Sequence, residues 1–213
     1  VVLVLGSRLG ETDWWGKAPN WAQPPAQKMI QVDIDEEILG MNKPAELTVL
    51  SDIKVFLRAL HEVLAAKVYR IDPSKRERLL REYQQTRARQ RDKLDRALKN
   101  RREPLVTAHV PVVCQKVFGD DAIFVMDGGN TTVWDQFYHE VHTPNTILGT
   151  AKFGMLGAGV AQALGAAAAW PDRQVYCILG DGAMGFNLQE IETAVRHNLP
   201  VIYLVCCDRQ WGM

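Results

Sequence analysis

Two short apolar runs, each followed by an aspartate, constrain the fold of this chain most strongly. Residues 174–179 and 201–206 are both rich in side chains that favour β-strands. Between them, apolar residues recur at helical spacing over 188–197. A strand, a helix and a second strand of these lengths form a right-handed crossover with parallel strands. The sequence therefore predicts that Asp181 and Asp208, which follow the two strands, lie at one edge of a sheet, where open α/β sheets bind ligands.

The predicted helix has its own start and stop signals. Asn187 precedes its apolar positions and is expected to be the N-cap, and Glu190 stands three residues later, where a capping-box partner belongs. Pro200 prevents the helix from continuing. We expect the start of this helix to present unpaired N–H groups beside the glycine-rich turn at 180–185.

The chemistry of two neighbouring carboxylates favours a bound cation. Two carboxylates a few Å apart raise each other's pKa unless a cation lies between them. Magnesium prefers oxygen ligands, taking one or two from carboxylates and the others from phosphate and water. Gly180, Gly182 and Gly185 would let the backbone approach a phosphate closely. The pattern predicts a magnesium–diphosphate site; the alternative is a tight strand-to-helix turn with an unrelated second aspartate.

Other elements are expected from local patterns. They are strands at 1–5, 29–32 and 123–126, and helices after Asp52, at 110–118 and at 158–169. Residues 72–103 carry twice as many basic as acidic side chains, and their few apolar residues fit one helical face. We interpret this stretch as a solvated helical connector; the alternative is a basic helix that binds RNA.

Several segments of the chain together resemble a known family. Gly180-Asp181-Gly182, followed by Cys207-Asp208 and residues 209–213, resembles the thiamine diphosphate signature of the acetolactate synthase, or 2-oxoacid decarboxylase and carboligase, family. Residues 125–134 resemble the family's diphosphate-contacting segment, and residues 154–159 its glycine-rich turn beneath the aminopyrimidine ring. Residues 2–9 and 30–35 are similar to the last part of the family's middle domain.

This resemblance implies a fold and a domain order. The fold is α/β, with parallel sheets and flanking helices in a thiamine diphosphate-binding fold, preceded by part of a Rossmann-like middle domain. The implied parts are the C-terminal part of the middle domain at 1–67, a charged helical linker at 68–104, and the thiamine diphosphate-binding domain, truncated at its C-terminus, at 105–213. The family's pyrimidine-binding domain has no counterpart here, so we expect this sequence to be a segment of a longer protein.

The resemblance also implies the cofactor site. The cofactor-binding positions that match the family's motifs are Gly128, Asn130, Thr131, Gly154, Leu156, Asp181, Gly182, Ala183, Asp208, Gln210 and Met213. The implied ligands of Mg²⁺ are the side chains of Asp181 and Asp208 and the main-chain carbonyl of Gln210. Where the family usually has Asn-Asn, this chain has Cys207-Asp208, so a carboxylate replaces the amide ligand. Either side chain offers an oxygen to magnesium.

The implied function is a thiamine diphosphate- and Mg²⁺-dependent 2-oxoacid decarboxylase or carboligase, a transferase or lyase that acts as a homodimer or homotetramer. The family's activating glutamate belongs to the pyrimidine-binding domain, so the resemblance places no catalytic acid or base here, and this segment alone is expected to be inactive. The alternatives are an acyl-CoA C–C lyase of the oxalyl-CoA decarboxylase type and a non-catalytic module that retains the fold.

Composition excludes other classes. The 25 basic and 25 acidic residues cancel, which gives no reason to expect a nucleic acid or membrane partner. No apolar run reaches the roughly 20 residues needed to span a bilayer, and no leader pattern opens the sequence, so we expect a cytoplasmic protein. The four cysteines form no Cys-x-x-Cys pair and are interpreted as reduced residues, not as a disulfide or zinc site.

Overall fold

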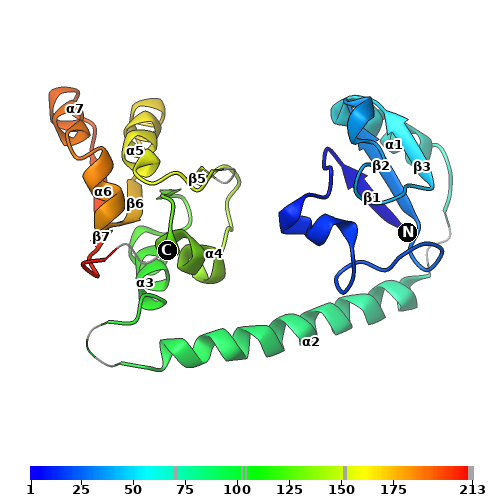
Figure 1. Ribbon diagram of the computed structural model, residues 1–213, viewed down its shortest axis with the longest axis horizontal. Helices are drawn as coiled ribbons and strands as arrows, with labels where there is room; N and C mark the ends of the chain where they lie inside the picture. Colours follow the sequence, from blue (N-terminus) through cyan, green and yellow to red (C-terminus); the bar gives the residue numbers. More distant parts are fainter. Residues whose placement is uncertain (70–71, 102, 104, 151–152, 211–213) are drawn as a thin grey trace. The chain divides into compact units, whose positions relative to one another are not determined.

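The chain forms two compact units. The computed structural model describes residues 1–69, 72–101, 103, 105–150 and 153–210 (Figure 1). One unit is Val1–Glu77 and the other is Arg78–Met213, and the division between them falls within the long helix α2 (Pro73–Leu98). Among the described residues, no helix combines the length and apolar character needed to cross a membrane.

The first unit is built on a parallel sheet with the strand order β1-β2-β3. Its elements are β1 (Val2–Leu5), η1 (Glu11–Gly16), β2 (Met29–Asp33), η2 (Glu36–Ile38), β3 (Leu47–Leu50) and α1 (Ile53–Ala65). The two predicted strands and the helix after Asp52 are confirmed. The Asp52 side chain caps α1 by accepting hydrogen bonds from the N–H groups of Lys54 and Val55 at 2.8 and 3.1 Å. Strand β3 was not predicted.

The second unit is built on a parallel sheet with the strand order β5-β4-β6-β7. Its strands are β4 (Ile123–Met126), β5 (Ile147–Gly149), β6 (Val175–Gly180) and β7 (Val201–Cys206). Its helices are the second part of α2, α3 (His109–Phe118), α4 (Asn130–Tyr138), α5 (Ala158–Ala169), α6 (Asp181–Phe186) and α7 (Glu190–Arg196). The expected α/β architecture of parallel sheets with flanking helices is confirmed, whereas α4 and β5 were not predicted.

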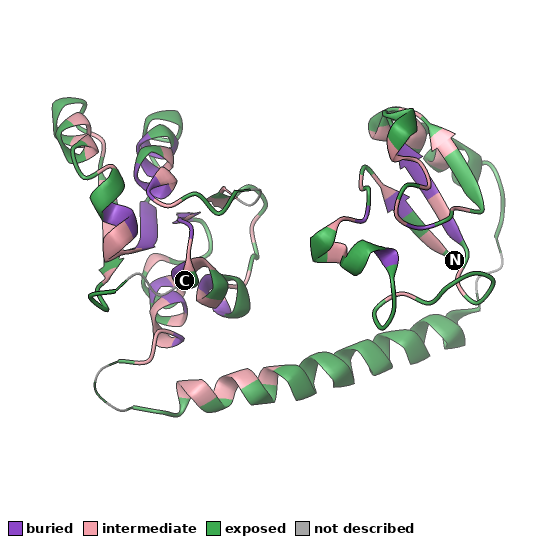
Figure 2. Ribbon diagram, in the orientation of Figure 1, coloured by how far each residue is buried: buried purple, intermediate pink, exposed green. Residues whose placement is uncertain are grey.

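Side chains on the central strands of this sheet alternate between two apolar layers, because successive residues of a strand point to opposite faces. Val125 and Cys177 pack with residues of α5 such as Val160. Phe124 and Tyr176 pack on the other face, with Cys114 of α3. Burial on both faces explains why β6 is a continuous apolar run instead of an alternating one. Figure 2 shows the resulting buried layer along the strands and on one side of α5.

The β6–β7 pair has the geometry expected from its sequence. The strands are parallel, and their register runs from Val175 opposite Val201 to Gly180 opposite Cys206. Because the strands are parallel and in this register, the residues that follow them leave the sheet at the same edge.

All four cysteines are free thiols; Cys177 is buried and Cys206 is half-buried.

The predicted helix start at Asn187 is wrong. The glycine-rich segment forms a short helix of its own, α6, and the backbone N–H of Asn187 ends it by donating to the carbonyl of Met184. The Asn187 side chain instead donates to the carbonyl of Gly157 at 2.9 Å. Helix α7 begins at Glu190, and the Glu190 carboxylate accepts a hydrogen bond from Thr193 at 2.8 Å rather than closing a capping box.

The C-terminal half of α2 contacts the end of α4 and the first residue of α3, His109, whose Nε2 lies 2.8 Å from the carbonyl of Leu98. The hydroxyl of Tyr138, at the end of α4, donates to the carbonyl of Leu94 at 2.7 Å. Arg91 lies over the Tyr138 ring, 5.6 Å from its centroid, and forms an ion pair with Glu140 at 3.6 Å. The N-terminal half of α2 is exposed (Figure 2). The helix predicted in this charged stretch is therefore present.

Candidate functional site

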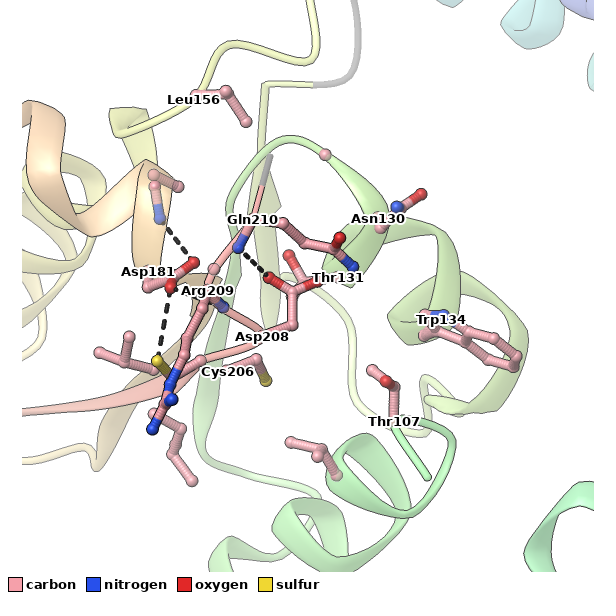
Figure 3. A pocket seen from close by; sticks show the side chains of 18 of the residues that line it. Thr107, Asn130, Thr131, Trp134, Leu156, Asp181, Cys206, Asp208, Arg209 and Gln210 are labelled. Atoms are coloured by element: carbon pink, nitrogen blue, oxygen red, sulfur yellow. Dashed lines mark hydrogen bonds between the residues drawn. The ribbon is translucent and has the colours of Figure 1, made fainter. Parts of the chain in front are cut away.

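A cavity of about 880 Å³ opens at the carboxyl ends of β4, β6 and β7 (Figure 3). It is lined by Leu105, Thr107, Val110, Gly128, Gly129, Asn130, Thr131, Trp134, Leu156, Gly180, Asp181, Gly182, Ala183, Leu204, Val205, Cys206, Cys207, Asp208, Arg209 and Gln210. The residues at and after the three strand ends thus supply most of the wall. The remainder comes from α4, from the start of α3 and the residues before it, and from Leu156 in the turn before α5. This edge of the sheet is the one that the sequence predicts as a binding site.

Asp181 lies at the cavity wall directly after β6. Its Oδ1 accepts a hydrogen bond from the N–H of Gly182 at 2.9 Å, and its Oδ2 accepts from the Cys207 thiol at 3.4 Å and from the N–H of Arg209 at 3.2 Å. The thiol, followed by the Gly182 N–H, lowers the pKa of the Asp181 carboxyl below its ordinary value. Asp181 is therefore ionised at neutral pH, as a metal ligand must be.

Asp208 enters the same cavity from the end of β7. Its Oδ1 accepts a hydrogen bond from the N–H of Gln210 at 3.1 Å, which folds the chain back after the strand. Figure 3 shows Asp181 and Asp208 facing the cavity from adjacent strand ends. Within the described ranges, no group of three or more His, Cys, Asp or Glu side chains is arranged to hold a metal ion. A cation bound by these two aspartates would take its other ligands from the backbone, water or a bound anion.

The N-terminus of α4 forms the opposite part of the wall. Gly129 is its N-cap, with a φ of +82°, and has no side chain to bond the first N–H groups of the helix. Asn130 and Thr131, in the first turn, line the cavity. A helix start of this kind binds phosphate through its backbone N–H groups and its dipole.

The turn before α5 packs tightly behind this segment. A Cβ atom at Gly128 would overlap the carbonyl oxygen of Gly154, so only glycine allows the two chains to meet there. A Cβ at Gly129 would lie 3.2 Å from Cδ2 of Leu156, which lines the cavity. The segments at 127–131 and 154–159, which resemble different parts of one cofactor site, are thus in contact.

The structure brings most of the predicted site residues to one cavity. Those that line it are Gly128, Asn130, Thr131, Leu156, Asp181, Gly182, Ala183, Asp208 and Gln210. Gly154 does not line the cavity; its carbonyl contacts Gly128, which does. Met213 lies outside the described residues. The sequence did not single out Leu105, Thr107 and Val110, because no motif marks the start of α3 or the residues before it. Trp134 of α4 also lines the cavity; it ends the segment 125–134, but it was not named as a site residue.

Two family models match separate parts of the chain. The family model described as thiamine pyrophosphate enzyme, C-terminal TPP binding domain, matches residues 127–213. The model described as thiamine pyrophosphate enzyme, central domain, matches residues 1–60. The central-domain match precedes the TPP-binding-domain match, and together they cover well over half of the chain.

Individual relatives have several activities. The 2-hydroxyacyl-CoA lyase 1 of Homo sapiens is 31% identical over 211 residues, which are 96% of this chain and 36% of the lyase. A probable acetolactate synthase large subunit of Methanococcus aeolicus is 28% identical over 199 residues, 87% of this chain and 32% of the synthase. Sulfoacetaldehyde acetyltransferase of Castellaniella defragrans is 28% identical over 231 residues, 100% of this chain and 38% of the transferase.

The chain thus spans 32% to 38% of the length of these three relatives. The relatives share the family but differ in the reaction that their names describe. The matched domain models, the parallel sheet and the motifs around the cavity agree with one another, and the chain belongs to the thiamine pyrophosphate enzyme family.

Proposed function

We propose that the full-length protein is a thiamine diphosphate- and Mg²⁺-dependent enzyme that breaks or forms a C–C bond beside a carbonyl group. The observation that carries the proposal is the convergence of Asp181 and Asp208 with the N-terminus of α4 on one cavity. Carboxylates suit Mg²⁺, and the helix start suits a phosphate group. Together they suit a magnesium diphosphate.

The residues of the cavity fit thiamine diphosphate in size and polarity. A volume of about 880 Å³ is large enough for the whole cofactor, since sites for small ligands span roughly 300–1,000 Å³. Leu156 offers an apolar wall, which suits an aromatic ring and not a diphosphate. Thiamine diphosphate, when bound, supplies an acceptor for the electron pair released as the C–C bond breaks.

The proposed roles divide between the metal and the phosphates. The side chains of Asp181 and Asp208 and the carbonyl of Gln210 would hold Mg²⁺. The diphosphate would be held by Asn130, Thr131, Gly182 and Ala183, all of which line the cavity. These contacts orient the cofactor and neutralise its charge, and we assign no acid or base among them. The activating glutamate is expected in another domain of the full-length protein.

The leading reaction is decarboxylation of a 2-oxoacid followed by carboligation, as in an acetolactate synthase. Similarity to the acetolactate synthase of Methanococcus aeolicus supports it. Cleavage of an acyl-CoA substrate is the second candidate, supported by similarity to 2-hydroxyacyl-CoA lyases. In either case we propose a homodimer or homotetramer of the full-length protein, with a small-molecule substrate and neither a nucleic acid nor a membrane partner.

Two measurements on the full-length protein test the proposal. Calorimetric titration with thiamine diphosphate should show binding with Mg²⁺ and none after chelation; no binding in either condition would contradict the proposal and favour a non-catalytic module. Product analysis should then show CO₂ and acetolactate from pyruvate. Release of an aldehyde and an acyl-CoA product from a 2-hydroxyacyl-CoA, without turnover of pyruvate, would select the second candidate.

A further inference from the structure

The Asp127 carboxylate joins two segments of the cavity wall. Asp127 follows β4, is 2% exposed, and its Oδ1 accepts hydrogen bonds from the N–H groups of Gly128 at 2.5 Å and Gly157 at 2.9 Å. Its Oδ2 accepts from the N–H of Gly159 at 2.8 Å. One buried side chain thus holds both the segment that leads into α4 and the turn that leads into α5.

Through these hydrogen bonds Asp127, which follows β4, caps the N-terminus of α5. Gly157 is the N-cap of α5 and has no side chain, so the first N–H groups of that helix need an acceptor from elsewhere. A carboxylate is the strongest acceptor available and also favours the positive end of the helix dipole. A Cβ at Gly159 would lie 2.7 Å from Oδ2 of Asp127, so a glycine is needed for the carboxylate to reach the helix.

Asn187 holds the same turn from the other side. Its Nδ2 donates to the carbonyl of Gly157 at 2.9 Å. Gly157 has a φ of +83°, and a Cβ there would lie 2.6 Å from Cβ of Phe186, at the end of α6. The N–H of Gly157 is therefore fixed by Asp127 and its carbonyl by Asn187. Because Asn187 is the C-cap of α6, which begins at Asp181, this second bond links the turn to the helix that carries the first metal-ligand candidate.

We propose that Asp127 and Asn187 are positioning residues that hold Leu156 in register with the diphosphate-binding segments. Leu156 directly precedes Gly157 and is the lining residue that the turn contributes. Its position sets where the apolar part of a ligand rests relative to the anchored diphosphate. The inference rests on the proposed function, because it assigns Leu156 to the ring portion of thiamine diphosphate.

A positioning role and a purely structural role predict different changes in ligand affinity. Loosening the turn should weaken binding of a ligand whose ring rests on Leu156, whereas a ligand that consists only of diphosphate should be held by α4 and α6 and be unaffected. General destabilisation of the unit would weaken both. Thiamine diphosphate and inorganic diphosphate, each with Mg²⁺, are therefore the two probes.

The first variant is Asn187→Ala in the full-length protein, with Asn42→Ala as the matched control. Asn42 also donates an amide hydrogen bond to a backbone carbonyl, that of Arg8 at 2.8 Å, but it belongs to the first unit. Calorimetry should show an affinity for thiamine diphosphate lowered about tenfold in Asn187→Ala, the equivalent of one lost hydrogen bond. Affinity for inorganic diphosphate should stay unchanged, and Asn42→Ala should alter neither. Equal losses for both ligands, or no loss for either, would overturn the proposal.

A second measurement does not depend on cofactor binding. Hydrogen exchange of peptides that cover 154–159, measured by mass spectrometry without cofactor, should be faster in Asn187→Ala and in Asp127→Asn than in the wild type. Unchanged exchange in Asn187→Ala would overturn the proposal even if Asp127→Asn failed to fold. A wild-type protein that binds neither probe would instead contradict the proposed function, and the exchange result would still decide whether these side chains hold the turn.

Discussion

Gly180 pairs with Cys206 at the last position of the β6–β7 register. The residues that follow this pair, Asp181 and Cys207, therefore leave the sheet next to each other, and the Cys207 thiol donates to Asp181 Oδ2 at 3.4 Å. The parallel register thus sets the position of Asp181, the first metal-ligand candidate, and places Asp208 at the same cavity.

Replacement of Gly129 should affect binding as well as stability. Gly129→Ala forces a φ of +82° on an alanine and places a Cβ 3.2 Å from Leu156. Gly119→Ala is the matched control, because Gly119 has a φ of +79° and open space around it. Both variants should lose about 1–3 kcal/mol of unfolding free energy in chemical denaturation. Only Gly129→Ala should also weaken cofactor binding; equal affinities in the two variants would contradict the assignment of Gly129 to the site.

Removal of the Tyr138 hydroxyl should lower stability, whereas removal of the Tyr176 hydroxyl should not. The Tyr138 hydroxyl donates to the carbonyl of Leu94 at 2.7 Å, so Tyr138→Phe should cost about 1 kcal/mol and lower the melting temperature. The Tyr176 hydroxyl is buried without a hydrogen-bond partner in the described part of the chain, and its ring stacks on Phe118 and Phe124. Tyr176→Phe keeps the ring and should leave the melting temperature unchanged or raise it. The reverse order of the two melting temperatures would contradict this packing.

The buried Asp135 should make stability fall as pH rises. Asp135 lies in α4 at 1% exposure, and burial raises the pKa of its carboxyl from 3.8 to about 8. The folded protein therefore binds a proton at Asp135 that the unfolded chain releases between these two values. In that range, its contribution to unfolding free energy should fall by up to about 1.4 kcal/mol per pH unit, and the full penalty is reached above pH 8.

Asp135→Asn removes this proton linkage and tests the prediction directly. Denaturation of wild type and variant across pH 5–8 should give a stability difference that shifts steadily in favour of the variant. A difference that stays constant with pH would show that the Asp135 carboxyl has the same pKa in the folded and unfolded protein.

The sheet of the second unit was largely predictable because its central strands are apolar on both faces. The run at 174–179 is such a strand, and its end is marked by Gly180 and Asp181. The short strand β5, three residues long, has no pattern that distinguishes it from a loop. Helix α4 was missed because Gly128-Gly129-Asn130 is typical of a turn, and the helix depends on tertiary contacts such as that between Tyr138 and Leu94.

The site was predictable where it follows strand ends and not where it depends on contacts between distant segments. Asp181 and Asp208 are placed by strand order alone. Asn187 was assigned to the nearest helix, whereas its partner, the carbonyl of Gly157, lies 30 residues earlier in the chain. A local pattern contains no information about such a pairing. The same holds for Asp127, whose partners at Gly157 and Gly159 belong to another segment.

Replacement of the two aspartates should have unequal effects on metal-dependent binding. Asp181→Ala removes an ionised carboxylate from the cavity, and thiamine diphosphate affinity in the presence of Mg²⁺ should fall at least about a hundredfold. Asp208→Asn keeps an oxygen ligand and restores the residue that the family usually has, so its affinity should stay close to that of the wild type. Loss of binding in Asp208→Asn would indicate a further role for the second carboxylate.

The most direct test of the proposed magnesium–thiamine diphosphate site is calorimetric titration of full-length wild type and Asp181→Ala with thiamine diphosphate, each with and without Mg²⁺. The predicted result is binding that requires Mg²⁺ in the wild type and is lost in Asp181→Ala. Equal affinities of the two proteins in the presence of Mg²⁺ would contradict it.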